Sequence, residues 1–265
     1  MLRRLLAKPL VSSGAAAFSL LSLAFVGSVP APVRAQAITD AQRPAIEQIV
    51  RDYLLKNPEV IQEAIGELEK RQQEAQRNSQ QTALREHGDA LTKSQHGSLV
   101  GNPSGDVTLV EFFDYNCGYC KRALADLKGL AKRDPKLRIV LKDFPVLGPE
   151  SLAASKVALA AKLQIQGDKL FDYHARLLET RGTVTGERAL ALAKEMSLDM
   201  TRLQKDVEGP EVRAALAENA MLADKLGLTG TPAFVIGDEV ISGAVGLEPL
   251  RQVVASVRQC GRATC

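Results

Sequence analysis

The sequence predicts an α/β fold with a parallel pair of strands and a large helical insertion. Residues 107–113 and 137–144 are β-branched or apolar runs of strand length, and the helix-forming stretch 118–133 separates them. This β-α-β order implies parallel strands with a right-handed crossover. Residues 149–227 then read as almost entirely helical, and 231–242 as two short strands joined as a hairpin.

The N-terminal residues 1–37 are typical of a secretory signal peptide. Three basic residues come first, an apolar stretch follows over 11–29, and a small-x-small cleavage pattern ends at Ala37. The alternative is a transmembrane anchor. Serines and a glycine interrupt the apolar stretch, and two prolines precede the cleavage pattern, so we favour cleavage. The expected location is the periplasm, where disulfides persist.

Composition is that of an ordinary globular chain. Of the 265 residues, 45% are hydrophobic and 25% are charged, which excludes disorder as the main state. The net charge of +3 is too small to indicate nucleic-acid binding. All four cysteines lie beyond the expected cleavage site.

Residues 38–96 predict a helical appendage. Positions 61, 65, 68, 72 and 75 follow alternating spacings of four and three, as in a coiled-coil seam, and the other faces are polar. All of them are apolar except Gln72, which weakens the pattern. A long polar helix cannot bury such a narrow stripe on itself. The partner is either the rest of the chain or another copy, and we favour a homo-oligomer formed through residues 40–91. Residues 92–106 are rich in Gly, Ser, Asn and Pro and predict a linker with a turn.

The chemistry centres on Cys117-Gly118-Tyr119-Cys120, which follows the first strand and opens the first helix of the β-α-β unit. A helix N-terminus favours an anion, here a thiolate, which is the nucleophile of disulfide exchange. The second sulfur lies one turn away and can close a disulfide. Half of a zinc site and a passive disulfide are the alternatives. The remaining cysteines and the scattered histidines have the wrong spacing for zinc, so no metal is expected.

Two features near the C-terminus complete the candidate site. Pro232 follows Thr231 and leads into a buried strand, where it supplies no N–H. If the bond between them is cis, a free backbone edge can face the sulfurs and pair with an extended substrate. Cys260 and Cys265 follow the closing helix 247–259 and predict a structural disulfide, with a free or metal-binding pair as the alternative.

In this order, the strand, Cys-x-x-Cys helix, helical insertion, Thr-Pro hairpin and terminal helix resemble the thioredoxin superfamily. The insertion is similar to that of DsbA-like proteins, and the N-terminal helices make the chain most similar to the ScsC group of secreted DsbA-like proteins. The resemblance covers about residues 40–260. It implies a thioredoxin-like DsbA-type catalytic domain over 97–265, with its helical insertion at about 149–227.

The resemblance also implies roles for individual residues. Cys117 resembles the attacking thiolate, and Cys120 resembles the resolving thiol. Pro232 matches the cis-proline of the family, and Thr231 offers its backbone to substrate. Glu111 falls where the family often places a buried acid that accepts the proton of the resolving thiol.

Two weaker expectations concern neighbouring side chains. A surface position is the alternative for Glu111, although its covered strand favours burial. Lys142, on the adjacent strand, could pair with that carboxylate. His174 lies on the apolar side of its helix, so we expect a core or domain-interface histidine.

The active-site dipeptide distinguishes between functions. DsbA-like oxidases commonly carry His in the third position of the motif, but here it is Tyr119. Gly118-Tyr119, with a threonine before the cis-proline, resembles DsbC-like isomerases, which are oligomers. We expect a protein disulfide isomerase without an organic cofactor, acting on disulfide-containing or reduced secreted proteins and served by a membrane redox partner. The alternatives are a DsbA-like dithiol oxidase and a copper-binding, copper-tolerance protein.

Overall fold

The computed structural model describes residues 39–265; the predicted signal peptide, 1–37, lies outside that range. The chain divides into two compact units, one ending at Val60 and the other comprising Ile61–Cys265. Within the described residues, every helix is too short or too polar to cross a membrane.

Helix α1 (Arg43–Lys56) belongs to the first unit. A proline lies in its first turn, where a missing N–H costs no helical hydrogen bond. Asn57 caps the C-terminus of the helix, and its N–H donates to the carbonyl of Tyr53. None of its residues is buried. Its large exposed apolar side chains are those of Ile46, Ile49, Val50, Tyr53 and Leu55. Among the described residues of its unit, α1 therefore presents an apolar surface without a partner.

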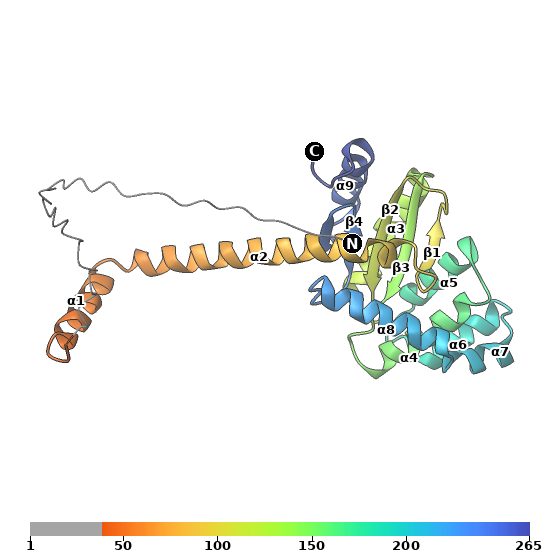
Figure 1. Ribbon diagram of the computed structural model, residues 1–265. Helices are drawn as coiled ribbons and strands as arrows, with labels where there is room; N and C mark the ends of the chain where they lie inside the picture. Colours follow the sequence, from red (N-terminus) through yellow and green to blue (C-terminus); the bar gives the residue numbers. More distant parts are fainter. Residues whose placement is uncertain (1–38) are drawn as a thin grey trace, which may run out of the picture. The chain divides into compact units, whose positions relative to one another are not determined.

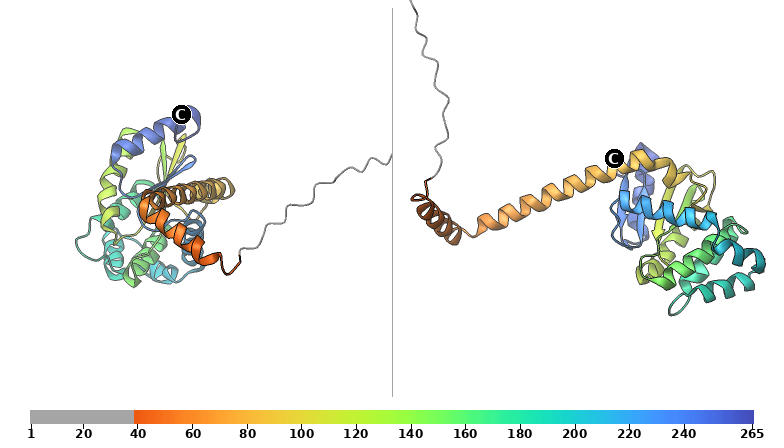
Figure 2. Two further views of the ribbon diagram at one scale, coloured as in Figure 1. Left: turned by 90° about the vertical axis from the view of Figure 1, so that its left-hand side faces the viewer. Right: turned by 60° about the horizontal axis from the view of Figure 1, so that its bottom comes forward.

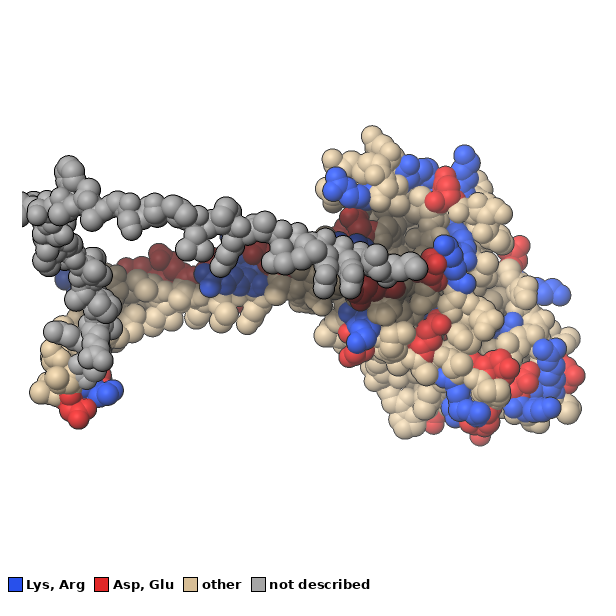
Figure 3. Space-filling view, viewed as in Figure 1, with Lys and Arg blue, Asp and Glu red and all other residues tan. Residues whose placement is uncertain are grey.

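Helix α2 (Glu59–Thr92) changes character along its length. Ile61, Ile65 and Leu68 are about half exposed, at 49%, 51% and 56%. Figure 3 shows charged side chains gathered along one side of this helix and uncharged ones along another. Further on, Leu84 and Leu91 are buried in the second unit. The apolar stripe thus precedes the part of the helix that packs on the sheet.

The second unit contains a five-stranded sheet (Figure 1), which confirms the predicted α/β class. The strands are β1 (Ser98–Gly101), β2 (Val107–Phe113), β3 (Leu137–Asp143), β4 (Ala233–Ile236) and β5 (Glu239–Ser242). Their spatial order is β1-β3-β2-β4-β5. Strands β2 and β3 are parallel, as the β-α-β order predicts, and the other neighbouring pairs are antiparallel.

Strand β1 lies within residues 92–106, which were expected to be linker and turn. It pairs antiparallel with β3, from Ser98 opposite Leu141 to Gly101 opposite Arg138. The strand is short and flanked by Gly, Asn and Pro, so its local sequence carries a turn signal. Pairing with β3 supplies the ladder that its own propensity does not predict.

Helices cover both faces of the sheet (Figure 2). They are α3 (Gly118–Arg133), α4 (Pro149–Lys162), α5 (Gly167–Glu179), α6 (Gly186–Glu195), α7 (Met200–Val207), α8 (Pro210–Lys225) and α9 (Leu247–Cys260). One core joins α3, α9 and the insertion helices α4–α7 to one face. A second core joins the last part of α2 and α8 to the opposite face.

The expected pairing of Lys142 with Glu111 is wrong. Lys142 is fully buried, and its Nζ donates to Glu218 Oε1 at 2.6 Å and to the carbonyl of Ala90 at 2.9 Å. Glu111 is in register with Leu141, the residue before Lys142. Successive strand residues point to opposite faces, so these two side chains lie on different sides of the sheet. Lys142 instead links β3 to α2 and α8.

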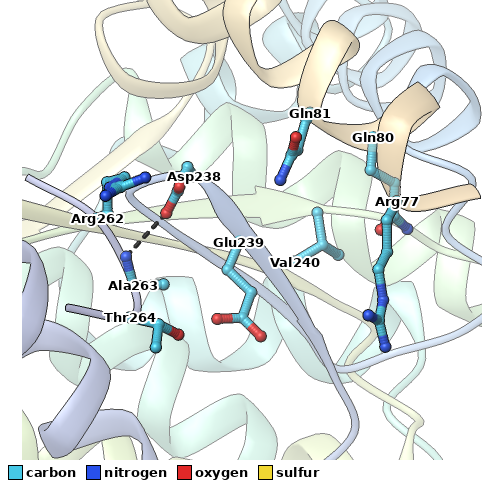
Figure 4. A pocket seen from close by; sticks show the side chains of 9 residues that line it. All are labelled: Arg77, Gln80, Gln81, Asp238, Glu239, Val240, Arg262, Ala263 and Thr264. Atoms are coloured by element: carbon cyan, nitrogen blue, oxygen red, sulfur yellow. Dashed lines mark hydrogen bonds between the residues drawn. The ribbon is translucent and has the colours of Figure 1, made fainter. Parts of the chain in front are cut away.

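The C-terminal tail is covalently closed. Cys260 and Cys265 form a disulfide, with Cα atoms 6.2 Å apart. Between them, the Ala263 N–H donates to Asp238 Oδ1 at 2.8 Å, which holds the tail against the β4–β5 turn. A polar cavity of about 650 Å³ lies between the tail, β5 and α2 (Figure 4). The cavity is lined by none of the predicted active-site residues.

Candidate active site

Cys117 occupies the N-cap position of α3, with extended backbone angles of φ −75° and ψ 117°. Its N–H donates to the carbonyl of Asp114, which closes a turn between β2 and the helix. The position places the sulfur at the positive end of the helix, where unpaired backbone N–H groups favour a thiolate. Cys117 is only 6% exposed, so a substrate sulfur has limited access to its thiol.

Cys120 lies one turn further into α3 and is fully buried. Both cysteines are free thiols in this structure. Burial raises the pKa of the Cys120 thiol well above its usual value, and the nearby Glu111 carboxylate raises it further. Cys120 therefore needs a proton acceptor before it can act as a nucleophile.

Glu111 lies within β2 and is buried, and its charge acts on the nearby Cys120 thiol. Burial raises the pKa of this carboxyl to about 8. Its Oε2 has no hydrogen-bond partner among residues 39–265. A carboxyl with such a pKa can exchange a proton near neutral pH. The Cys120 thiol is close enough for the Glu111 charge to raise its pKa.

The Thr231–Pro232 peptide bond is cis. The carbonyl of Thr231 accepts a 3.1 Å hydrogen bond from Cys117 Sγ, so this loop lies directly against the first sulfur. Pro232 leads into β4, and its carbonyl accepts the N–H of Gly243. The structure therefore brings the two predicted motifs together at one place.

The two residues between the cysteines face outward. Tyr119 is 58% exposed, and the guanidinium of Arg122 lies 4.2 Å from the centre of its ring. A Cβ added to Gly118 would meet no atom within 4 Å. This side of the motif is therefore open to a partner molecule, and Tyr119 offers it an aromatic surface.

His174 is a buried core residue, as predicted. It is 1% exposed, and its ring packs edge-on against Phe113 at 4.6 Å between centroids. Its Nδ1 lies 3.4 Å from the hydroxyl of Tyr115. Burial lowers the pKa of His174 to about 3, so the imidazole is neutral under ordinary conditions.

Sequence reasoning missed the polar residues that surround the motif. Asp114 is fully buried, and its carboxylate accepts from Ser151 Oγ and from the N–H groups of Asn116, Val146 and Leu147. These contacts fix the loop that precedes Cys117. The available signal was Asp114 and Asn116, which lie within three residues of the end of a buried strand. Short turns are usually polar, so the two residues did not stand out.

A Cys-x-x-Cys helix packed on a mixed sheet, with a cis-proline loop against its first sulfur, defines a thioredoxin-like protein of the thiol–disulfide oxidoreductase class. The chain belongs to the DSBA-like thioredoxin domain family, which it matches over residues 108–255. Residues 42–75 match the copper resistance protein ScsC N-terminal domain.

Solved structures agree with this assignment. A thioredoxin-like oxidoreductase from Silicibacter pomeroyi is 42% identical, with a TM-score of 0.61, and the match covers 65% of this chain and 98% of that one. ScsC from Proteus mirabilis, in a transitional conformation, is 29% identical, with a TM-score of 0.60. That match covers 84% of this chain and 98% of ScsC, and it includes much of the N-terminal segment.

Among curated relatives, the Na(+)/H(+) antiporter NhaA 1 of Salinispora arenicola is 27% identical over 160 residues. The match covers 59% of this chain and 24% of the antiporter, so the chain spans about a quarter of that relative. A probable disulfide bond formation protein D from Bacillus anthracis is 24% identical, with 52% of this chain and 68% of that protein covered.

Proposed function

We propose that this protein is a periplasmic thiol–disulfide oxidoreductase that isomerises disulfides in secreted proteins. The observation that carries the proposal is the position of Cys117, which begins α3 and lies 3.1 Å from the carbonyl of Thr231, next to the cis Pro232. A substrate peptide in extended conformation can pair with the backbone of this loop while its sulfur meets Cys117.

In the proposed reaction, the Cys117 thiolate attacks one sulfur of a substrate disulfide. A bond forms between Cys117 and that sulfur, the substrate bond breaks, and the other substrate sulfur leaves as a thiolate. A different substrate thiolate then attacks the mixed disulfide and expels Cys117. The substrate acquires a new pairing, and no net electrons are exchanged.

Cys120 provides a second way to resolve the mixed disulfide. In its ionised form, which its pKa of about 8 leaves as a minor fraction at neutral pH, Glu111 accepts the Cys120 proton. The resulting thiolate attacks the sulfur of Cys117 and releases the bound substrate sulfur as a thiol. The protein is left with a Cys117–Cys120 disulfide and has reduced the substrate by two electrons. A membrane redox partner must then return two electrons to the pair.

Two features favour isomerisation over oxidation. Gly118-Tyr119, with Thr231 before the proline, is the combination that resembles DsbC-like isomerases. The exposed apolar residues of α1 and of the first part of α2 support a homo-oligomer in which catalytic domains share substrates. The ScsC N-terminal domain match covers the same region. We assign self-association to this stripe and secretion to residues 1–37.

The test is refolding of a protein with scrambled disulfides. Ile65→Glu with Leu68→Glu breaks the stripe, whereas Lys70→Glu changes the net charge equally on the opposite side of α2. The unmodified chain and Lys70→Glu should both be oligomers by light scattering and should restore native disulfides. The double variant should be smaller and inactive in refolding. If all three fail to refold the substrate but oxidise a reduced protein, the protein is an oxidase.

Copper binding is a second candidate, favoured by the match to the copper resistance protein ScsC N-terminal domain. The Cys117 and Cys120 thiols are soft donors that suit Cu(I). The described residues contain no cluster of three or more His, Cys, Asp or Glu side chains, so these two sulfurs would be the main ligands. A redox titration with and without Cu(I) separates the functions, because tight copper binding would withdraw the thiols from exchange.

A further inference from the structure

The loop 180–185, between α5 and α6, is held by side chains on either side of the Cys-x-x-Cys motif. Asn116, directly before Cys117, binds one end of the loop. Its Oδ1 accepts the N–H of Val184 at 2.7 Å, and its Nδ2 donates to the carbonyl of Val184 at 3.0 Å. Val184 is fully buried and Asn116 is partly exposed, so these two bonds are partly shielded from water.

Lys121, directly after Cys120, binds the other part of the same loop. Its Nζ donates to the carbonyls of Thr180 at 2.8 Å and Gly182 at 3.0 Å. Thr180 caps the C-terminus of α5, where carbonyls without helical partners attract a cation. The ammonium is thus tied to the helical insertion.

A third side chain, Arg188, donates to the two carbonyls that remain between these contacts, those of Arg181 and Thr183. Five successive carbonyls of the loop, from residue 180 to 184, therefore accept hydrogen bonds from side chains. Polar side chains thus fix this backbone where a regular helix or strand would use its own N–H groups.

We propose that Asn116 and Lys121 are positioning residues that act as one clamp: through the loop 180–185 they hold the start of α3 in the conformation from which Cys117 attacks a disulfide. The inference rests on the proposed thiol–disulfide exchange and adds two residues to it. The helical insertion is then a support for the nucleophile as well as a cover for the sheet.

The geometry explains why both residues are needed. Asn116 fixes the backbone immediately before the nucleophile, and its Nδ2 also donates to Ser151 Oγ, which in turn donates to the buried Asp114. Lys121 fixes the first turn of α3 from the other side. Releasing either contact lets the turn around Cys117 move relative to the cis-proline loop, and small misplacements of a nucleophile slow a reaction strongly.

The experiment measures attack by the reduced full chain on oxidised glutathione, followed by release of the glutathione thiol. Asn116→Ala and Lys121→Met should each slow the reaction about tenfold, the scale expected when one or two hydrogen bonds are lost. The double variant should be no slower than the slower single variant, because one clamp is broken either way. Lys121→Arg, which keeps the donors, should restore most of the rate.

Two controls match these changes. Lys128→Met removes a cation from the same helix, where Lys128 pairs with Glu179 and not with the loop. Thr183→Ala changes an exposed side chain of the loop itself. Both should react within twofold of the unmodified chain. Circular dichroism identifies any variant that does not fold, and Lys121→Met, at a partly exposed position, tests the clamp if Asn116→Ala is unstable.

The inference is overturned if Asn116→Ala and Lys121→Met react as fast as their controls, or if Lys121→Arg is as slow as Lys121→Met. Release of the first glutathione thiol reports on attack by Cys117 and involves no isomerisation. Failure of the unmodified chain to refold a scrambled protein would therefore contradict the proposed function and leave the clamp result intact.

Discussion

Cys117 Sγ donates a 3.1 Å hydrogen bond to the carbonyl oxygen of Thr231, across 114 residues of sequence. Only the protonated thiol makes this bond, because a thiolate has no proton to donate. On ionisation, the same carbonyl becomes free to accept an N–H from a substrate backbone. The contact thus places the proposed nucleophile beside the backbone that we propose as the docking edge for substrate.

Because the two cysteines have different proposed roles, replacing each by serine should have a different effect. Cys117→Ser should abolish exchange, because the first attack requires its thiolate. Cys120→Ser should keep that attack and accumulate mixed disulfides, because the buried resolving thiol is gone. Non-reducing electrophoresis with a protein substrate measures the trapped species. If Cys117→Ser accumulated the mixed disulfide instead, Cys120 would be the attacking cysteine and Cys117 the resolving one.

Glu111→Gln should stabilise the protein at alkaline pH. Burial raises the pKa of Glu111 from 4.5 to about 8, so the folded state holds this proton where the unfolded state releases it. The stability due to the protonated carboxyl is complete below pH 4.5 and is lost as pH rises through about 8. Denaturant unfolding at several pH values measures the free energy of unfolding of both proteins. The value for the variant should increase relative to that of the unmodified chain as the pH rises from 4.5 to about 8.

A second buried carboxyl, Asp143, does not disturb that comparison. Asp143 is another buried carboxyl, whose pKa burial raises to about 7, and it is present in both proteins. Its contribution cancels in the difference. A stability difference that does not change with pH would contradict the buried, protonated state of Glu111.

Glu218→Gln should destabilise the fold by about 2–3 kcal/mol, because it leaves the buried ammonium of Lys142 without its counter-charge. The matched control is Glu208→Gln, which breaks a surface pair with Lys156 and should cost at most about 1 kcal/mol. Denaturant unfolding measures both. Equal losses would show that the buried pair does not hold α2 and α8 on the sheet.

Replacing Cys260 and Cys265 together by serine should leave the glutathione reaction unchanged and lower stability by at most about 2 kcal/mol, since the closed loop is short. The tail between them should become sensitive to proteolysis, because the contact of Ala263 with Asp238 would lose its covalent support. A large loss of thiol exchange would instead indicate that this second disulfide takes part in the reaction.

Local patterns were sufficient to predict much of this protein. The strand, Cys-x-x-Cys and helix around Cys117 follow from apolar runs, spacing and helix-forming residues that lie together in the chain. The same holds for the hairpin after Pro232 and for the helices of the insertion. Burial of Glu111 also follows locally, since it lies within a strand covered on both faces.

Tertiary structure decided what depends on distant partners. Strand β1 exists because β3 offers it a ladder, and Lys142 meets Glu218 because of the face on which strand register places it. In the sequence, Asn116 and Lys121 look like ordinary polar residues. The tertiary structure brings the loop 180–185 into contact with both of them. Periodicity reports which face of an element is buried, but a hydrogen bond needs a particular partner at a particular distance, and that partner is set by how the chain closes on itself.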